Sequence, residues 1–396
     1  MNPNLNAGEL LAKSAEEQSR EGYVHTLREI LQQPSTWLDT CNRVLARAAA
    51  IERLAGGIAN LVFTGSGSSL YAGECVRLAL QKELGVTVKA VGAGALLTHG
   101  AAALPSGRPG LLVSLARSGD SPESVAVVSL LLGAEPQMRH LVITCNQAGQ
   151  LYTAYRDDPR VQVLLLDDRT NDRSLAMTSS LTNMSLAARF LGMPSAPERY
   201  TLLCERLSRA CGHLLANALD PLAGVAGTGF GRAVFLGSGS RLGAAHEAAL
   251  KMLEMTDGRV PTLSETYLGV RHGPMSFIHE DTLVVCFLSS DPLLRAYESD
   301  LLRELDRKRL GLAKVIVGER IPAALLRAAD TAIECPGLQE IGDENAPLLD
   351  VVVGQVLAFF RCLAEGLRPD SPCASGIINR VVERFPLHEA AGRGQP

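Results

Sequence analysis

Short apolar runs alternate with amphipathic stretches along most of the chain. In the first half, β-branched or leucine-rich runs predict strands at 87–92, 110–115, 140–145 and 161–166, and in the second half at 282–288 and 313–318. Stretches with helical patterning, such as 121–132 and 293–308, lie between them. Fully apolar strands that alternate with helices are typical of α/β folds with mostly parallel sheets covered on both faces.

An internal repeat divides the chain. Segment 61–70 (LVFTGSGSSL) recurs as 233–242 (AVFLGSGSRL), at an offset of 172 residues between Gly67 and Gly239. Each copy predicts a strand, a glycine-serine turn and an amphipathic helix, over about 70–83 and 242–255. Because the offset is about one domain in length, we expect two similar α/β domains. The expected division is a helical segment 1–45, domains 46–205 and 206–370, and a tail 371–396, with a boundary within 195–225 and a joint at 224–231.

Composition and charge argue against several classes of protein. The 396 residues carry 38 Lys and Arg against 42 Asp and Glu, so no nucleic-acid partner is expected. The most apolar stretch, 348–364, is interrupted by Asp350, Gln355 and Arg361, so no membrane span is expected either. The N-terminus lacks the pattern of a secretory signal. Nine scattered cysteines without a CxxC pair predict buried thiols in a reducing compartment, and hence a cytoplasmic protein.

The glycine-serine turns suit an anion, because backbone N–H groups are exposed there at the positive end of a helix. Leu70 and Leu242 interrupt a dinucleotide-binding GxGxxG, and no GxxxxGK[ST] occurs, so neither dinucleotides nor nucleoside triphosphates are favoured. For one such turn alone, a purely structural role is the simpler interpretation.

A second serine-rich turn favours anion binding over a purely structural role. Segment 116–124 (ARSGDSPES) follows a predicted strand and opens a helix, with Pro122 in its first turn. Turns that follow parallel strands converge at one edge of the sheet. We therefore expect a phosphate monoester to be surrounded by Ser68, Ser69, Ser118 and Ser121, with Arg117 supplying charge. The equivalent segment of the second half, 289–292, lacks the glycine, so one phosphate site is expected.

The second repeat adds titratable groups. Its helix carries His246, Glu247, Lys251 and Glu254, where the first helix has Glu74, Cys75, Ala79 and Lys82. Lys251 and Glu254 share a helix face, with Glu247 one turn earlier. A solvated surface of salt bridges is the alternative interpretation.

His272 lies in an irregular segment before Gly-Pro, where an imidazole could move protons or make a structural hydrogen bond. A phosphate clamp, a carboxylate and a histidine suit proton chemistry on a sugar phosphate. His272 would open the ring, and Glu254 would move hydrogen between C2 and C1. Neither step requires a metal or a cofactor, and none is predicted.

Together these residues resemble the tandem sugar isomerase (SIS) fold, and most closely the tagatose-6-phosphate ketose/aldose isomerase family, also described as galactosamine-6-phosphate deaminase/isomerase. The marks are REILQQPSTW (28–37), RSGDSPES (117–124), LAMTSSLTNM (175–184), SETYLGVRHGPMSFI (264–278) and INRVVERFPLH (378–388). The resemblance covers nearly the whole chain. It implies an enzyme that converts D-galactosamine 6-phosphate to D-tagatose 6-phosphate and ammonia.

The isomerase domain of glucosamine-6-phosphate synthase is similar in layout. That similarity implies a C2 base at Glu254, with Lys251 beside it and His272 reaching the site from a partner subunit, so a homodimer or higher homo-oligomer is expected. It also implies phosphate on Ser68, Ser69, Arg117, Ser118 and Ser121, with Thr178 and Ser179 lining the sugar. Ala116 departs from the usual serine. The chain begins Met1-Asn2 without a cysteine nucleophile, so glutamine-driven amination is not expected.

Two alternatives remain open. One is aldose–ketose isomerisation of a hexose phosphate, or deglycation of a sugar-amine phosphate, without the galactosamine preference. The other is a non-catalytic sugar-phosphate-binding regulator. Against a regulator, no basic helix-turn-helix segment precedes the first repeat, and Lys251, Glu254 and His272 would be unnecessary for binding alone.

Overall fold

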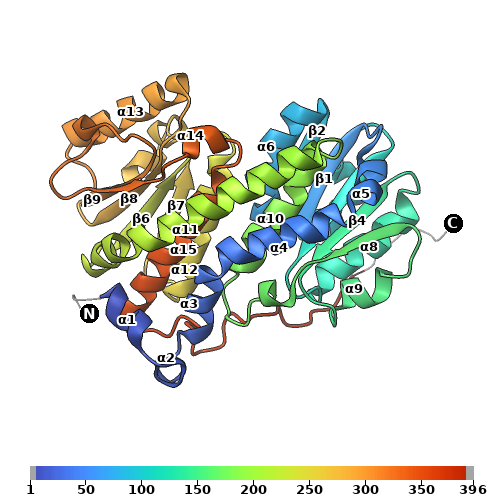
Figure 1. Cartoon of the computed structure of the whole chain (residues 1–396), viewed down its shortest axis with the longest axis horizontal. Coiled ribbons are helices and arrows are strands. Elements are labelled where there is room, and N and C mark those ends of the chain that lie inside the picture. The colour runs from blue at the N-terminus through green and yellow to red at the C-terminus, as the bar shows by residue number, and fades with distance from the viewer. Residues whose placement is uncertain (1–5, 389–396) are drawn as a thin grey trace.

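The computed structural model describes residues 6–388 and contains two five-stranded parallel sheets (Figure 1). The strands of the first sheet, in spatial order, are β2 (Thr87–Gly92), β1 (Asn60–Gly65), β3 (Gly110–Ala116), β4 (Arg139–Thr144) and β5 (Val161–Leu165). Those of the second are β10 (Thr331–Glu334), β9 (Ala313–Gly318), β8 (Thr282–Phe287), β6 (Arg232–Leu236) and β7 (Thr262–Glu265). When the second sheet is followed from β7, both sheets have the same order. The α/β prediction and the repeat are confirmed.

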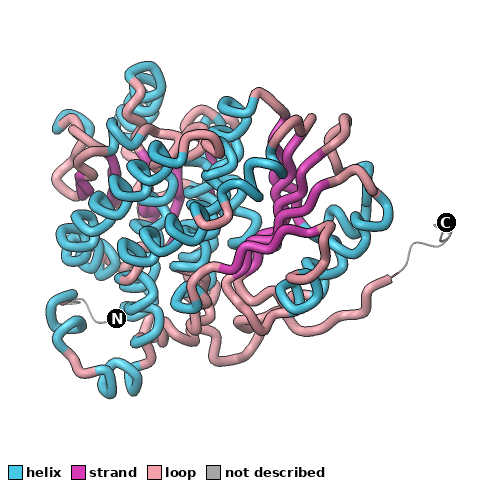
Figure 2. Tube along the Cα trace, turned by 45° about the vertical axis from the view of Figure 1, so that its right-hand side comes forward, coloured by secondary structure: helices cyan, strands magenta, loops and turns pink. Residues whose placement is uncertain are grey.

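Helices cover both faces of the sheets (Figures 1 and 2). The N-terminal helices are α1 (Ala7–Ala12), α2 (Ala15–Glu21), α3 (Val24–Leu31), α4 (Gln33–Leu45) and α5 (Ala48–Ala55). Those within the first half are α6 (Ser68–Leu84), α7 (Ala93–His99), α8 (Pro122–Ala134), α9 (Gln150–Tyr155) and α10 (Ser179–Arg189). The remaining helices are α11 (Pro197–Gly227), α12 (Arg241–Met255), α13 (Pro292–Arg307), α14 (Leu338–Ile341) and α15 (Pro347–Ala364).

Helix α15 lies in the centre of the molecule against α11 and α12. It is long and apolar enough to cross a membrane by length and composition, but 94% of it is buried inside the protein. Its apolar residues on every side therefore serve as core, as expected for a helix enclosed by others. Gly354 allows close approach, because a Cβ there would lie 2.5 Å from Cβ of Ala248 on α12.

The region predicted to hold the domain boundary is helical. Residues 197–227 form the single helix α11, which packs against α4 and α15. The predicted joint at 224–231 is wrong in its first half, because Gly224 and Gly227 belong to that helix. Helix packing outweighs the low helix propensity of glycine here. The domain limits themselves stay a prediction.

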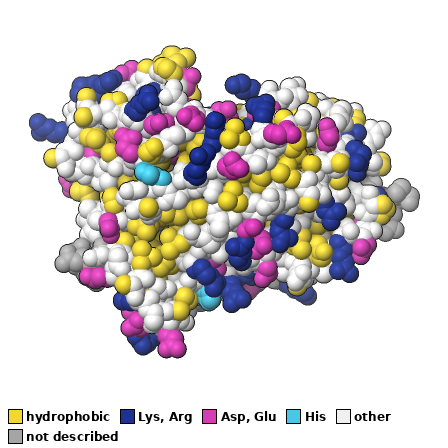
Figure 3. Space-filling model, in the orientation of Figure 1, with side chains coloured by type: hydrophobic (Ala, Val, Ile, Leu, Met, Phe, Trp, Pro, Cys, Tyr) yellow, Lys and Arg dark blue, Asp and Glu magenta, His cyan; other side chains and the backbone are white. Residues whose placement is uncertain are grey.

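The described part of the predicted tail, 371–388, has no helix or strand and runs along the first half of the molecule (Figure 1). Residues 1–5 and 389–396, which belong to the predicted N-terminal segment and tail, lie outside the described residues. All nine cysteines are buried and free, which confirms the prediction of buried thiols. Acidic and basic side chains are mixed over the face shown in Figure 3.

Candidate active site

The first serine turn joins β1 to α6. Gly67 has a φ of 55°, a conformation that favours glycine, and α6 begins at Ser68 directly after it. Ser68 and Ser69 are buried in the first turn of this helix, where backbone N–H groups have no partner within the helix. The strand–turn–helix prediction is confirmed, and it provides donors for an anion.

The second serine turn joins β3 to α8. The helix begins at Pro122, as the sequence predicts, and Gly119 has a φ of 70°. Arg117 and Ser118 are buried, and Ser121 is the residue before the helix. Since β1 and β3 are neighbours, the two turns lie at the same edge of the first sheet.

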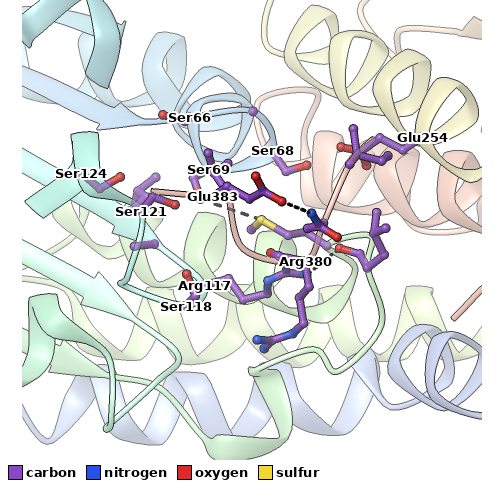
Figure 4. A pocket seen from close by; sticks show the side chains of 18 of the residues that line it. Ser66, Ser68, Ser69, Arg117, Ser118, Ser121, Ser124, Glu254, Arg380 and Glu383 are labelled. Atoms are coloured by element: carbon purple, nitrogen blue, oxygen red, sulfur yellow. Dashed lines mark hydrogen bonds between the residues drawn. The ribbon is translucent and has the colours of Figure 1, made fainter. Parts of the chain in front are cut away.

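Both turns open into one cavity of about 460 Å³ (Figure 4). Its walls come from the two turns, from Leu175 and Met177, from Glu254 on α12, and from the tail. The lining residues that carry side-chain functional groups are Ser66, Ser68, Ser69, Arg117, Ser118, Ser121, Ser124, Glu254, Asn379, Arg380 and Glu383. The cavity therefore combines the predicted phosphate-binding residues with the predicted base.

Arg117 mainly contacts backbone carbonyl groups and does not simply point its donors at a bound phosphate. Its guanidinium donates hydrogen bonds to the carbonyl oxygens of Ser174, at 3.2 Å, and Leu175, at 3.0 Å, and also to that of Arg380. Burial, together with the charge of Arg380, lowers the pKa of Arg117 to about 10. The side chain thus adds a positive field to the cavity while most of its donors hold the chain's own carbonyl groups.

The titratable residues of α12 form a buried group rather than a solvated surface, so the alternative interpretation is wrong. Lys251 and Glu247 are completely buried, with Nζ and Oε1 3.4 Å apart. Lys251 also donates a hydrogen bond to Glu254, whose side chain is 25% exposed at the cavity. Burial, which outweighs the attraction of Lys251, raises the pKa of Glu247 to about 8. Burial alone would lower the pKa of Lys251, but the charges of Glu247 and Glu254 raise it.

Four of the predicted residues do not line the cavity: Lys251, which lies behind Glu254 and contacts it, and His272, Thr178 and Ser179. His272 follows a short 3₁₀ turn, Gly269–Arg271; it is exposed and is not among the lining residues. Thr178 and Ser179 are completely buried, and the backbone N–H of Thr178 donates to the carboxylate of Asp172 at 2.8 Å. A single chain therefore brings together the serines, Arg117, Lys251 and Glu254, but not His272, Thr178 or Ser179.

The tail contributes cavity residues that no sequence argument singled out. Seven lining residues come from the segment 376–383, including Arg380 and Glu383. The only signal was the segment INRVVERFPLH, which marked the family resemblance without suggesting a role for any residue.

The corresponding turn of the second sheet holds a carboxylate of the chain itself. The backbone N–H groups of Ser290 and Asp291 donate to Asp343, at 2.8 and 3.1 Å. Asp343 thus fills a turn that could otherwise take an anion. Within residues 6–388, no group of three His, Cys, Asp or Glu side chains is placed to hold a metal ion.

Comparisons with known proteins identify the family. AgaS of Streptomyces coelicolor is 40% identical over 372 residues, which cover 92% of this chain and 95% of that protein. The chain belongs to the AgaS family. A second member, the D-galactosamine-6-phosphate deaminase AgaS of Shewanella sp. strain ANA-3, is 34% identical over 94% of each chain. No family model matches the chain.

A solved structure agrees with this membership. The tagatose-6-phosphate ketose/aldose isomerase of Escherichia coli superposes with a TM-score of 0.81 at 33% identity, over 88% of this chain and 95% of that one. Each of these similarities extends over most of this chain. Members of the AgaS family are enzymes that act on sugar phosphates, and the resemblance inferred from the sequence is confirmed.

Proposed function

We propose that this protein is a D-galactosamine-6-phosphate deaminase that releases D-tagatose 6-phosphate and ammonia. One observation carries the proposal: Glu254 lies in the same cavity as two serine turns at helix N-termini, with Lys251 at its side. A carboxylate that faces a phosphate-binding pocket is suited to removing a proton from the carbon skeleton of a sugar phosphate.

The phosphate would be held mainly by neutral donors. Ser68, Ser69, Ser118 and Ser121 offer hydroxyl groups, and the first turns of α6 and α8 offer backbone N–H groups. Arg117 adds positive charge from behind the turns. Helix N-termini stabilise a phosphate dianion through these N–H groups and the helix dipole.

The chemistry would proceed on the open-chain sugar. The Glu254 carboxylate takes the proton from C2, the electron pair moves toward the C1 carbonyl, and O1 takes a proton from the C2 ammonium group, which gives a neutral enaminol. Return of the proton to C1 leaves an imine at C2. Water then adds to C2, and ammonia departs as the C2 ketone forms. Lys251 would hold the Glu254 carboxylate in place through the charge-assisted hydrogen bond that it donates.

Ring opening would need a partner subunit. We assign this step to His272 of a second copy, because His272 of the same chain is exposed and outside the cavity. The active form would therefore be a homodimer or a larger homo-oligomer, located in the cytoplasm. The two domains would meet near residue 205, the first holding the phosphate and the second the base. Thr178 and Ser179 would support the sugar-binding wall through Asp172.

The test is a coupled ammonia assay with galactosamine 6-phosphate and glucosamine 6-phosphate side by side. Ammonia from the galacto compound supports the proposal, and ammonia from neither contradicts it. Replacement of Glu254 by Gln should lower kcat by about 10²- to 10⁴-fold while substrate still binds. Full activity of Glu254→Gln would exclude Glu254 as the base.

Aldose–ketose isomerisation of a nitrogen-free hexose phosphate is the second candidate. It uses the same base and the same transfer between C2 and C1, and the E. coli structural relative is named for it. Interconversion of tagatose 6-phosphate with an aldose phosphate, without ammonia release, would identify it.

A further inference from the structure

The tail brings a second carboxylate into the cavity. Of the four ionisable residues that line it, Arg117 and Arg380 hold oxygens of the chain, and Glu254 serves as the proposed base. Glu383 is the fourth, and in Figure 4 its carboxylate points into the cavity. Its side-chain partner is Asn379, whose Nδ2 donates to Oε1 at 3.3 Å. The function proposed above leaves this carboxylate without a task.

Hydrogen bonds attach the tail to the rest of the chain three residues before Glu383, whose own side chain is exposed. Nε of Arg380 donates to the carbonyl oxygen of Asp172 at 2.6 Å, and its other donor reaches Oδ1 of Asn171 at 2.6 Å. Arg117 in turn donates to the carbonyl oxygen of Arg380. These bonds fix the position of residue 380 along the cavity wall. Asn379 also donates to the carbonyl oxygen of Gly376, which ties Glu383 to the preceding turn of the tail.

The charges in the cavity indicate what Glu383 recognises. A second carboxylate near a bound phosphate dianion weakens binding, because like charges repel. The same carboxylate strengthens binding if the ligand also carries a cation, and a carboxylate–ammonium hydrogen bond is among the stronger ones. An amino-sugar phosphate has both charges, whereas the corresponding hexose phosphate has only the phosphate.

We infer that Glu383 is a specificity-determining residue that accepts a hydrogen bond from the C2 ammonium group of the substrate. This inference rests on the proposed function, which names an amino-sugar phosphate as the substrate. It also predicts that the substrate and the product differ in affinity. Once ammonia has left, the ketose product has no cation to offset Glu383, so the product binds more weakly than the substrate.

Equilibrium binding in a Glu254→Gln background tests the inference, because galactosamine 6-phosphate is then not consumed. The Kd values of galactosamine 6-phosphate and galactose 6-phosphate are compared with and without Glu383→Gln. We expect the preference for the amino sugar to fall on the order of tenfold, through weaker binding of the amino sugar alone. The matched control is Arg384→Gln, on the adjacent tail residue, which does not line the cavity. It should leave both Kd values unchanged.

Several results would overturn the inference: an unchanged preference, an equal loss for both ligands, or no binding of the amino sugar by any form. An equal loss would show that Glu383 only holds the tail. Ammonia release by the wild-type protein is measured separately, so the two proposals fail independently. A protein that releases no ammonia, yet loses its amino-sugar preference in Glu383→Gln, would contradict the deaminase and keep the role of Glu383.

Discussion

Nζ of Lys251 lies 3.4 Å from Oε1 of Glu247, and both side chains are completely buried. The same ammonium group donates a hydrogen bond to Glu254, so one cation contacts two carboxyl groups on the same face of α12. Because burial raises the pKa of Glu247 to about 8, that carboxyl group holds a proton near neutral pH. The positive charge of Lys251 is then available to Glu254, which faces the cavity.

Replacement of Lys251 by Met should therefore impair catalysis. We expect kcat to fall by about 10²-fold, because the Glu254 carboxylate loses the charge-assisted hydrogen bond that Lys251 donates to it. The measurement is kcat and KM in the ammonia assay. Lys308→Met, on an exposed lysine paired with Glu304, is the control and should behave as wild type. A wild-type kcat for Lys251→Met would contradict the role of this lysine.

The raised pKa of Glu247 should appear in the pH dependence of stability. Between about pH 4.5 and pH 8 the folded protein holds a proton that the unfolded chain has lost, so the free energy of unfolding falls as pH rises through this window. Glu247→Gln removes this contribution and should flatten the curve. Urea unfolding at pH 5.5, 7 and 8.5 measures the difference.

Two other carboxyl groups serve as references for that experiment. Glu29, whose pKa burial raises to about 7, contributes a slope of the same sign that stays in both proteins. The pKa of Glu304 is lowered to about 2 by its hydrogen bonds to Lys308 and Arg271. Glu304→Gln should therefore lower stability by a constant amount above about pH 4.5, leave the slope there unchanged, and approach wild-type stability as pH falls toward 2. Equal slopes for wild type and Glu247→Gln above pH 5.5 would refute the argument.

One sugar phosphate should bind per chain, despite the two similar sheets. Asp343 already accepts the backbone N–H groups of the second turn, whereas the first turn faces the cavity. Ser121→Ala should weaken galactosamine 6-phosphate binding about fivefold, the effect of losing roughly 1 kcal/mol of hydrogen bonding. Ser290→Ala, at the corresponding turn, should have no effect. Titration calorimetry gives both the affinity and the stoichiometry, and two ligands per chain would contradict this prediction.

The elements that hold the site are predicted by local signals in the sequence. A glycine that needs a positive φ, such as Gly67 or Gly119, marks the end of a strand, and Pro122 marks the start of a helix. Helical spacing correctly placed Glu247, Lys251 and Glu254 on one face. These features depend on neighbours within four residues, so a single sequence contains them.

Other parts of the site depend on segments that are far apart in the chain. The tail has no periodic pattern, so its contact with Arg117, 263 residues away, leaves no local trace. The occupation of the second turn by Asp343 is a similar long-range event, 53 residues from Ser290. Gly224 shows the opposite case, where a local helix-breaking tendency is overcome by packing against other helices. His272 lies outside the cavity of its own chain, and in the function proposed above it acts from a second chain, which no local pattern could indicate.

Loosening the tail should weaken substrate binding more than it slows the chemistry. Arg380→Ala removes the hydrogen bonds to Asn171 and Asp172 that hold the cavity wall, so we expect KM to rise about tenfold with a smaller change in kcat. Arg384→Ala, four residues further on and outside the cavity lining, should leave both constants unchanged. Steady-state kinetics distinguish these results. A fall in kcat without a change in KM would show that the tail acts on the reaction rather than on binding.

The spacing between α12 and α15 should control both stability and activity. A Cβ at Gly354 would lie 2.5 Å from Cβ of Ala248, so Gly354→Ala forces the two helices apart and should lower the free energy of unfolding by about 1–3 kcal/mol. Gly224→Ala, where no heavy atom lies within 4 Å, should instead raise it by up to about 1 kcal/mol. Urea unfolding measures both changes.

The same displacement reaches the proposed base, because Ala248 and Glu254 lie on one helix, about two turns apart. Gly354→Ala should therefore lower kcat severalfold at temperatures where the protein is fully folded, since a base displaced by a fraction of an ångström transfers protons poorly. Gly224→Ala should keep wild-type kcat. If Gly354→Ala lost stability but kept full activity, α12 could shift without moving Glu254, and the close packing of α15 would serve the core alone.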